Sequence, residues 1–147
     1  QEVPAVISAA SGGGYASYNT STEALTLRVT TAGADDATAA HIHTGRVGNN
    51  GPVLVALVSG GTGIWEAPAG ATLDADTFAV LASGGHYVNV HTPANPSGEL
   101  RGQILTDNFT LVTFALSGDQ EVSAASSMAS GSGYALVDTN NFGLELK

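Results

Sequence analysis

The histidines of this chain are concentrated in two short stretches. The first stretch contains His41 and His43 on either side of Ile42, and the second, Tyr87–Thr92, contains His91 directly after Val90. Side chains of a β-strand point alternately to its two faces, so His41 and His43 face away from the core if Ile42 faces into it. The same reasoning turns His91 outward if Val90 is buried. Two neighbouring strands would then carry three imidazoles on one outer face.

Imidazole is a common ligand of zinc and copper in proteins. Two histidines at i and i+2 on one strand, with a third on the neighbouring strand, can reach a single ion. The sequence therefore predicts a copper or zinc site at His41, His43 and His91. His86 is a fourth candidate ligand, although its parity places it on the opposite face from His91. The alternative is that these are solvated or hydrogen-bonded histidines with no metal.

The composition excludes several classes of function. The 147 residues correspond to one ordinary domain, or to one domain and a fragment of another. Lys and Arg total only 4 against 13 Asp and Glu, and a nucleic-acid partner needs a basic patch that this chain lacks. The absence of cysteine excludes disulfides, thiolate metal sites and cysteine nucleophiles. No apolar run is long enough to span a membrane.

Alternating apolar residues predict the strands that position the histidines. Leu25, Leu27 and Val29 predict a half-buried strand, and the nearly continuous apolar run Pro52–Val58 predicts a strand covered on both faces, followed by a loop at 59–63. A later strand, Glu99–Leu105, places its polar side chains outward on what we expect to be a solvated face. The alternative is that Glu99 or Gln103 from that strand orients a histidine.

One helix is expected, over Thr72–Ser83, with Thr72 as its N-cap and Gly84 as its end. Combined with the strands, this pattern predicts an all-β fold. The specific prediction is an antiparallel β-sandwich of the Greek-key, immunoglobulin-like type with one short helix.

The end of the chain repeats its beginning. Residues 120–147 align without gaps on residues 1–28 at an offset of 119, with Gln1, Glu2 and Val3 matched by Gln120, Glu121 and Val122. A second unit therefore begins near Phe109. Two interpretations remain open: the chain is part of a longer tandem array, or its extra strands pair with a neighbouring protomer and link subunits head to tail.

Three motifs occur in the order found in a known family. They are the histidine stretch with its glycine-rich loop, the stretch Tyr87–Thr92, and Pro96–Ile104. Together they resemble the CHRD domain, a module named after chordin. The resemblance implies an extracellular or cell-surface module, often repeated, found in microbial surface proteins and in animal regulators of growth factors. We expect a CHRD-like domain at 1–108, and at 109–147 either the beginning of a second repeat or a donated strand segment.

These observations favour a structural or binding module of an extracellular protein over an enzyme. The expected partner is a neighbouring repeat or protomer, bound through strand pairing. The alternative function is a copper- or zinc-dependent enzyme, since a three-histidine site with an open position could activate water or carry out copper redox chemistry. The His41 and His43 pair is similar to copper ligands of copper-zinc superoxide dismutase, but the cysteines of that family are absent. No catalytic residue is assigned from the sequence.

Overall fold

The computed structural model describes residues 2–107, 109–117, 120, 122, 127–139 and 144–146. The chain divides into two compact units, Gln1–Ile104 and Leu105–Lys147, which we call unit 1 and unit 2 and describe separately. The domain boundary expected at residue 108 falls on a position outside the described residues.

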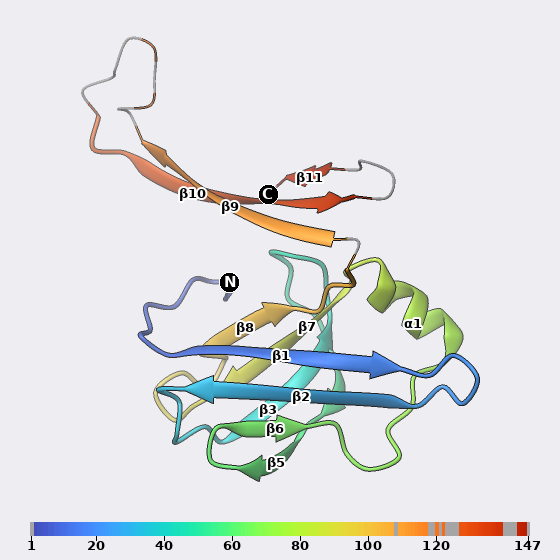
Figure 1. Ribbon diagram of the computed structural model, residues 1–147. Coiled ribbons are helices and arrows are strands. Elements are labelled where there is room, and N and C mark those ends of the chain that lie inside the picture. The colour runs from blue at the N-terminus through green and yellow to red at the C-terminus, as the bar shows by residue number, and fades with distance from the viewer. Residues whose placement is uncertain are drawn as a thin grey trace. The chain divides into compact units, whose positions relative to one another are not determined.

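Unit 1 is a sandwich of two four-stranded antiparallel sheets (Figure 1). The first sheet has the order β1-β2-β6-β5 and the second has the order β4-β3-β7-β8. The antiparallel sandwich with one short helix, expected from the sequence, is confirmed. The elements of unit 1 are β1 (Ser11–Tyr18), β2 (Leu25–Ala32), β3 (Ala39–Thr44), β4 (Val53–Ala56), β5 (Val58–Gly61), β6 (Ile64–Glu66), α1 (Ala75–Ala82), β7 (His86–His91) and β8 (Leu100–Gln103).

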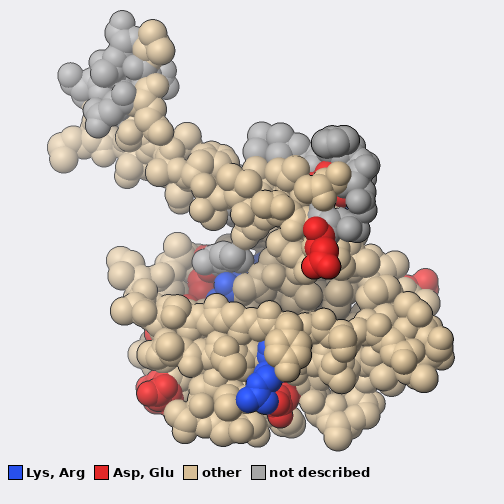
Figure 2. All heavy atoms as spheres, in the orientation of Figure 1, with Lys and Arg blue, Asp and Glu red and all other residues tan. Residues whose placement is uncertain are grey.

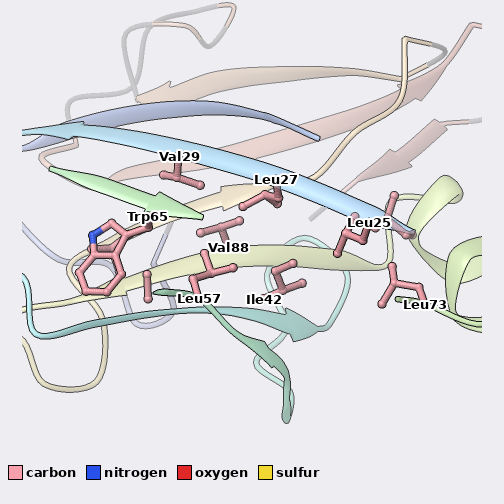
Figure 3. Packing of buried hydrophobic residues seen from close by; sticks show 11 residues of the cluster. Leu25, Leu27, Val29, Ile42, Leu57, Trp65, Leu73 and Val88 are labelled. Atoms are coloured by element: carbon pink, nitrogen blue, oxygen red, sulfur yellow. The ribbon is translucent and has the colours of Figure 1, made fainter. Parts of the chain in front are cut away.

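The hydrophobic core of unit 1 lies between the two sheets. Leu27 of β2 points toward Ile42 of β3 and Val88 of β7, as Figure 3 shows, and all three are buried. This packing requires every second residue of β3 and β7 to face inward. The packing therefore determines which side chains of β3 and β7, the strands that carry the histidines, face outward.

The apolar run at residues 52–58 is not one strand covered on both faces. Val53–Ala56 forms β4 of one sheet and Val58–Gly61 forms β5 of the other, so the prediction of a continuous strand was wrong. Leu57 lies at the crossing point, where its side chain is buried and its N–H donates to the carbonyl of Ala40. Val53 and Val58 are 53% and 47% exposed because both β4 and β5 are edge strands. Much of the loop expected at 59–63 is therefore strand.

Helix α1 begins later than the sequence pattern indicated. Asp74 is its N-cap, and the carboxylate of Asp74 accepts a hydrogen bond from the N–H of Thr77 at 2.7 Å. Hydrogen bonds from the side chain and from the N–H of Thr77 hold the pKa of Asp74 below its usual value. The prediction that Thr72 caps the helix was wrong, because Thr72 instead forms an isolated β-bridge with Ala24.

The described residues of unit 2 form one sheet of the order β11-β10-β9. Its strands are β9 (Phe109–Ser117), β10 (Ser130–Asp138) and β11 (Leu144–Leu146).

The face of the molecule drawn in Figure 2 carries few charged side chains, and these are scattered rather than clustered. This distribution agrees with a composition that is only 12% charged.

Candidate metal centre

Strands β3 and β7 are neighbours in the second sheet of unit 1. They pair antiparallel, with His43 opposite Tyr87 and His41 opposite Asn89. Ile42 and Val90 are buried in the core, so the alternate residues His41, His43 and His91 emerge on the outer face of the sheet. The pairing of the two strands thus brings together histidines that are far apart in the sequence.

The structure groups His41, His43 and His91 closely. One ring nitrogen from each lies within 4.8 Å of the corresponding atoms of the other two, and all three residues are half-buried. The closest approach is 3.0 Å, between Nδ1 of His41 and Nε2 of His91. The rings of His41 and His43 are also neighbours, with centroids 5.6 Å apart and nearly perpendicular planes. Among the described residues, this is the group of His and acidic side chains compact enough for a metal ion.

Two of the three imidazoles are oriented by backbone carbonyls. Nδ1 of His43 lies 2.9 Å from the carbonyl oxygen of Gly51, and Nδ1 of His91 lies 3.1 Å from that of Pro96. A carbonyl only accepts hydrogen bonds, so both Nδ1 atoms must carry the proton, and we assign the tautomers accordingly. Nε2 of each neutral ring then carries a lone pair, and the lone pair of His91 accepts the hydrogen bond from Nδ1 of His41. Such carbonyl partners are typical of metal-binding histidines.

The distances suit a metal ion with small adjustments. Two nitrogens bound to one ion at about 2.0–2.1 Å lie roughly 2.9 Å apart at a right angle and roughly 3.3 Å apart at a tetrahedral angle. The 3.0 Å between His41 and His91 falls in this range. Because the three nitrogens lie within 4.8 Å, closing on one ion requires a movement of no more than about 1.5 Å. Nε2 of His43 is buried and has no hydrogen-bond partner in the described part of the chain.

The electrostatics of the group favour the neutral form of His41. Burial lowers the pKa of His41, and the charges that His91 and His43 carry when protonated lower it further. A neutral imidazole is the form that binds a metal ion. His41 is therefore available as a ligand over a wider range of pH than an exposed histidine.

A buried aromatic and cationic support lies next to the group, and sequence reasoning missed it. Tyr87 stacks on His43 with ring centroids 5.0 Å apart, and the guanidinium of Arg101 lies 3.4 Å from the centre of the Tyr87 ring. Arg101 also donates hydrogen bonds to the carbonyls of Arg46 and Asn49 in the loop after β3. Tyr87 and Arg101 are only 2% and 8% exposed. The expectation of a solvated outer face was therefore wrong here.

The N-terminal segment covers part of the same face. The amide of Asn89 donates to both carboxylate oxygens of Glu2, at 2.8 and 3.1 Å, and the amide of Asn50 donates to the carbonyl of Val3. Burial raises the pKa of Glu2, against the opposing effects of Asn89 and the positive charge of Arg101. The recurrence of Gln-Glu-Val at 1–3 and 120–122 was the signal in the sequence that could have indicated this role.

His86 does not join the other three histidines. It is 1% exposed on the core side of β7, and its Nε2 lies 3.4 Å from Oγ1 of Thr44. Glu99 accepts hydrogen bonds from Ser8 and Thr92. Gln103 donates to the carbonyls of Gly45 and Gly84. The observed partners that orient the histidines are backbone carbonyls rather than these two polar side chains.

The fold and the histidine group define a β-sandwich module with a cluster of imidazoles on one sheet face. The CHRD domain family matches residues 1–104, and the chain belongs to that family. CHRD domains are non-enzymatic modules that occur in secreted proteins. No curated protein and no solved structure matched the chain. Within the described residues, no helix has the length and apolar character needed to cross a membrane.

Proposed function

We propose that this CHRD domain is a binding module of an extracellular or cell-surface protein that holds one copper or zinc ion at His41, His43 and His91. The observation that supports it best is the convergence of three ring nitrogens within 4.8 Å on two paired strands. The carbonyls of Gly51 and Pro96 support it further, because they leave Nε2 of His43 and of His91 as lone-pair donors. The ion would replace the hydrogen bond between His41 and His91.

The ligand chemistry favours copper or zinc over other metals. Neutral imidazole suits both ions, whereas magnesium and calcium prefer oxygen ligands. The chain has no cysteine, so iron–sulfur and thiolate sites are excluded. Three protein ligands leave a further coordination position for water or for a side chain from a partner.

Metal content tests the proposal directly. Full-length protein is incubated with copper or zinc, passed through gel filtration and assayed for bound metal, and we expect close to one ion per chain. His41→Ala, His43→Ala and His91→Ala should each lose most of the metal, because two remaining imidazoles bind an ion far more weakly. His86→Gln is the matched control and should retain it. Failure of the wild-type protein to retain either metal would refute the site.

Binding is favoured over catalysis by the composition of the group. It contains three histidines and no carboxylate, and the Glu2 carboxylate on the same face is held by the amide of Asn89 rather than left as a general base for metal-bound water. A redox assay and a hydrolysis assay with copper- or zinc-loaded protein separate the two functions. We expect no turnover beyond that of the same protein with His41→Ala. Turnover that depends on all three histidines would instead favour the enzyme.

Head-to-tail assembly through strand pairing is a second candidate function of the chain, compatible with metal binding. The observation that favours it is that β10 and β11 of unit 2 pair in the same way as β1 and β2 of unit 1. Unit 2 adds a third strand, β9, which pairs with β10.

A further inference from the structure

The sequence repeat is also a repeat of strand register. In unit 1, Ala16 pairs with Leu27 and Tyr18 pairs with Leu25. In unit 2, the residues 119 positions later pair in the same way: Ala135 with Leu146 and Val137 with Leu144. Strand β10 is therefore the structural counterpart of β1, and β11 is the counterpart of β2.

Strand β10 carries a neighbour that β1 lacks. In unit 2, β9 pairs along the whole of β10, on the side opposite β11. In the described part of unit 1, β1 pairs with β2 alone and is an edge strand of its sheet. The edge of β1 that faces away from β2 corresponds to the edge of β10 that pairs with β9. This edge of β1 has no neighbouring strand in the described part of unit 1, and such edges readily accept another strand.

The inner face of β1 is incompletely covered. Tyr18 packs against the core of unit 1, so Gly12, Gly14 and Ala16 share its face of the strand. These three small residues are exposed, whereas their neighbours Leu27 and Val29 on β2 are buried. A Cβ atom added at Gly12 would lie 3.0 Å from the carbonyl oxygen of Thr30, with the methyl groups of Thr31 and Leu100 at 3.3 and 3.7 Å. The face of β1 therefore borders an apolar part of the core that an additional strand could cover.

Strand β9 has the side chains that this position lacks. Val112, Phe114 and Leu116 alternate along one face of β9 and are 46%, 39% and 55% exposed. In unit 2 they lie opposite Ala135, Gly133 and Gly131, which are the counterparts of Ala16, Gly14 and Gly12. Directly opposed residues lie on the same face of a sheet. The large residues of β9 thus match the small residues of both β10 and β1. Neither β9 nor β1 contains a charged residue that would oppose pairing.

We propose that the free edge of β1 binds strand β9 of a second copy of this chain, antiparallel and in the register that β9 has with β10. Val112 of one copy then lies opposite Ala16 of the other, and Phe114 lies opposite Gly14. This inference rests on the assembly suggested above and adds the donor, the acceptor and the register. The same hydrogen-bonding edge of β9 serves both partners, so the donor strand leaves its own β10. The nine residue pairs between β9 and β10 are exchanged for the pairs that the eight residues of β1 can form, and the gain comes from burying three apolar side chains.

Disulfide trapping tests the register, because the chain has no cysteine of its own. Full-length Ala16→Cys and full-length Val112→Cys are mixed and oxidised. We expect a disulfide-linked heterodimer in several-fold greater yield than from Tyr15→Cys mixed with Val112→Cys, since Tyr15 faces the other side of β1. Val112→Cys combined with Ala135→Cys in one chain is the positive control for geometry and should close an internal disulfide. Equal yields from the Ala16 and Tyr15 mixtures would overturn the proposal.

The double variant Ala16→Cys/Val112→Cys distinguishes a second copy from the same chain. Dimers and longer cross-linked species are expected, with a yield that rises with protein concentration. A disulfide closed within the monomer, independent of concentration, would overturn the assignment of the donor to another copy.

Sedimentation provides a test that needs no disulfide. Wild-type protein should form larger species as its concentration rises, whereas Phe114→Lys and Leu116→Lys should remain monomeric, because these exposed side chains become buried only on assembly. Thr113→Lys, on the opposite face of β9, is the matched control and should assemble as the wild type does. A wild-type protein that stays monomeric at all concentrations would overturn the proposal. Metal content is measured on the same samples, so loss of assembly and loss of the histidine site are distinguished.

Discussion

At the scale of single residues, the four histidines differ mainly in the face of the strand they occupy. His41, His43 and His91 emerge beside one another on the outer face, whereas His86 enters the core. Burial alone lowers the pKa of His86, since no charged neighbour contributes. Protonation of His86 therefore opposes folding.

The pH dependence of stability should reveal this cost. Above about pH 6.5, His86 is neutral in both states and contributes no pH dependence. As pH falls below that value, the unfolded chain binds a proton that the folded chain does not, so the free energy of unfolding decreases until the lower folded pKa is reached. His86→Gln cannot bind this proton and should lose less stability between about pH 7.5 and about pH 5. Urea unfolding at several pH values measures both slopes, and equal slopes would contradict the prediction.

Strand parity was sufficient to predict the grouping of His41, His43 and His91, because alternation is a local property of the sequence. It could not predict the support beneath them. Arg101 is buried on an outer face, where its guanidinium lies over Tyr87 and donates to two carbonyls of the loop after β3. This burial depends on contacts between segments distant in sequence, which neither composition nor periodicity records.

At the scale of elements, the loop between β3 and β4 links the fold to the histidine group. The N–H of Thr44 donates to the carbonyl of Pro52, which closes the loop, and the carbonyl of Gly51 orients His43. A Cβ atom at Gly51 would lie 1.7 Å from the carbonyl oxygen of Thr44. Only glycine fits at this position, so the loop must open to accept any other residue.

Gly51→Ala should therefore affect stability and metal binding together. We expect a loss of more than about 1 kcal/mol in the free energy of unfolding. Metal affinity should fall by roughly 10- to 100-fold because His43 loses the carbonyl that orients it. Denaturant unfolding and metal titration measure the two effects.

Gly102→Ala on β8 is the control, since the space around Gly102 is open, and it should change neither quantity appreciably. A Gly51→Ala protein with wild-type metal affinity would show that the carbonyl is dispensable.

The elements that the sequence misplaced are those whose position depends on the other sheet. The apolar run at 52–58 shows that the segment is partly buried, but hydrophobicity does not show that the chain passes from one sheet to the other at Leu57. In the same way, Thr72 and Asp74 are both good N-caps by residue type. Tertiary pairing of Thr72 with Ala24 leaves Asp74 to cap the helix.

At the scale of the whole molecule, the two units differ in the number of sheets formed by their described residues. Unit 1 has two sheets that enclose a core, whereas the described part of unit 2 is a single sheet whose apolar side chains Val112, Phe114 and Leu116 are exposed. A single three-stranded sheet buries little apolar surface and contributes little stability of its own. We therefore expect unit 2 to contribute less to the stability of the chain than unit 1.

A chain that ends at Ile104 should accordingly keep the fold and the metal content of the full chain and lose its assembly. Its core and its three histidines all lie within unit 1. We expect a cooperative thermal transition by circular dichroism and a metal content equal to that of the wild type. The truncated chain retains the acceptor edge of β1 but lacks the donor β9, so it can end a growing assembly without extending it. Added to the full chain in excess, it should shift the sedimentation profile toward smaller species. Unchanged assembly in that mixture would show that β1 is not the acceptor.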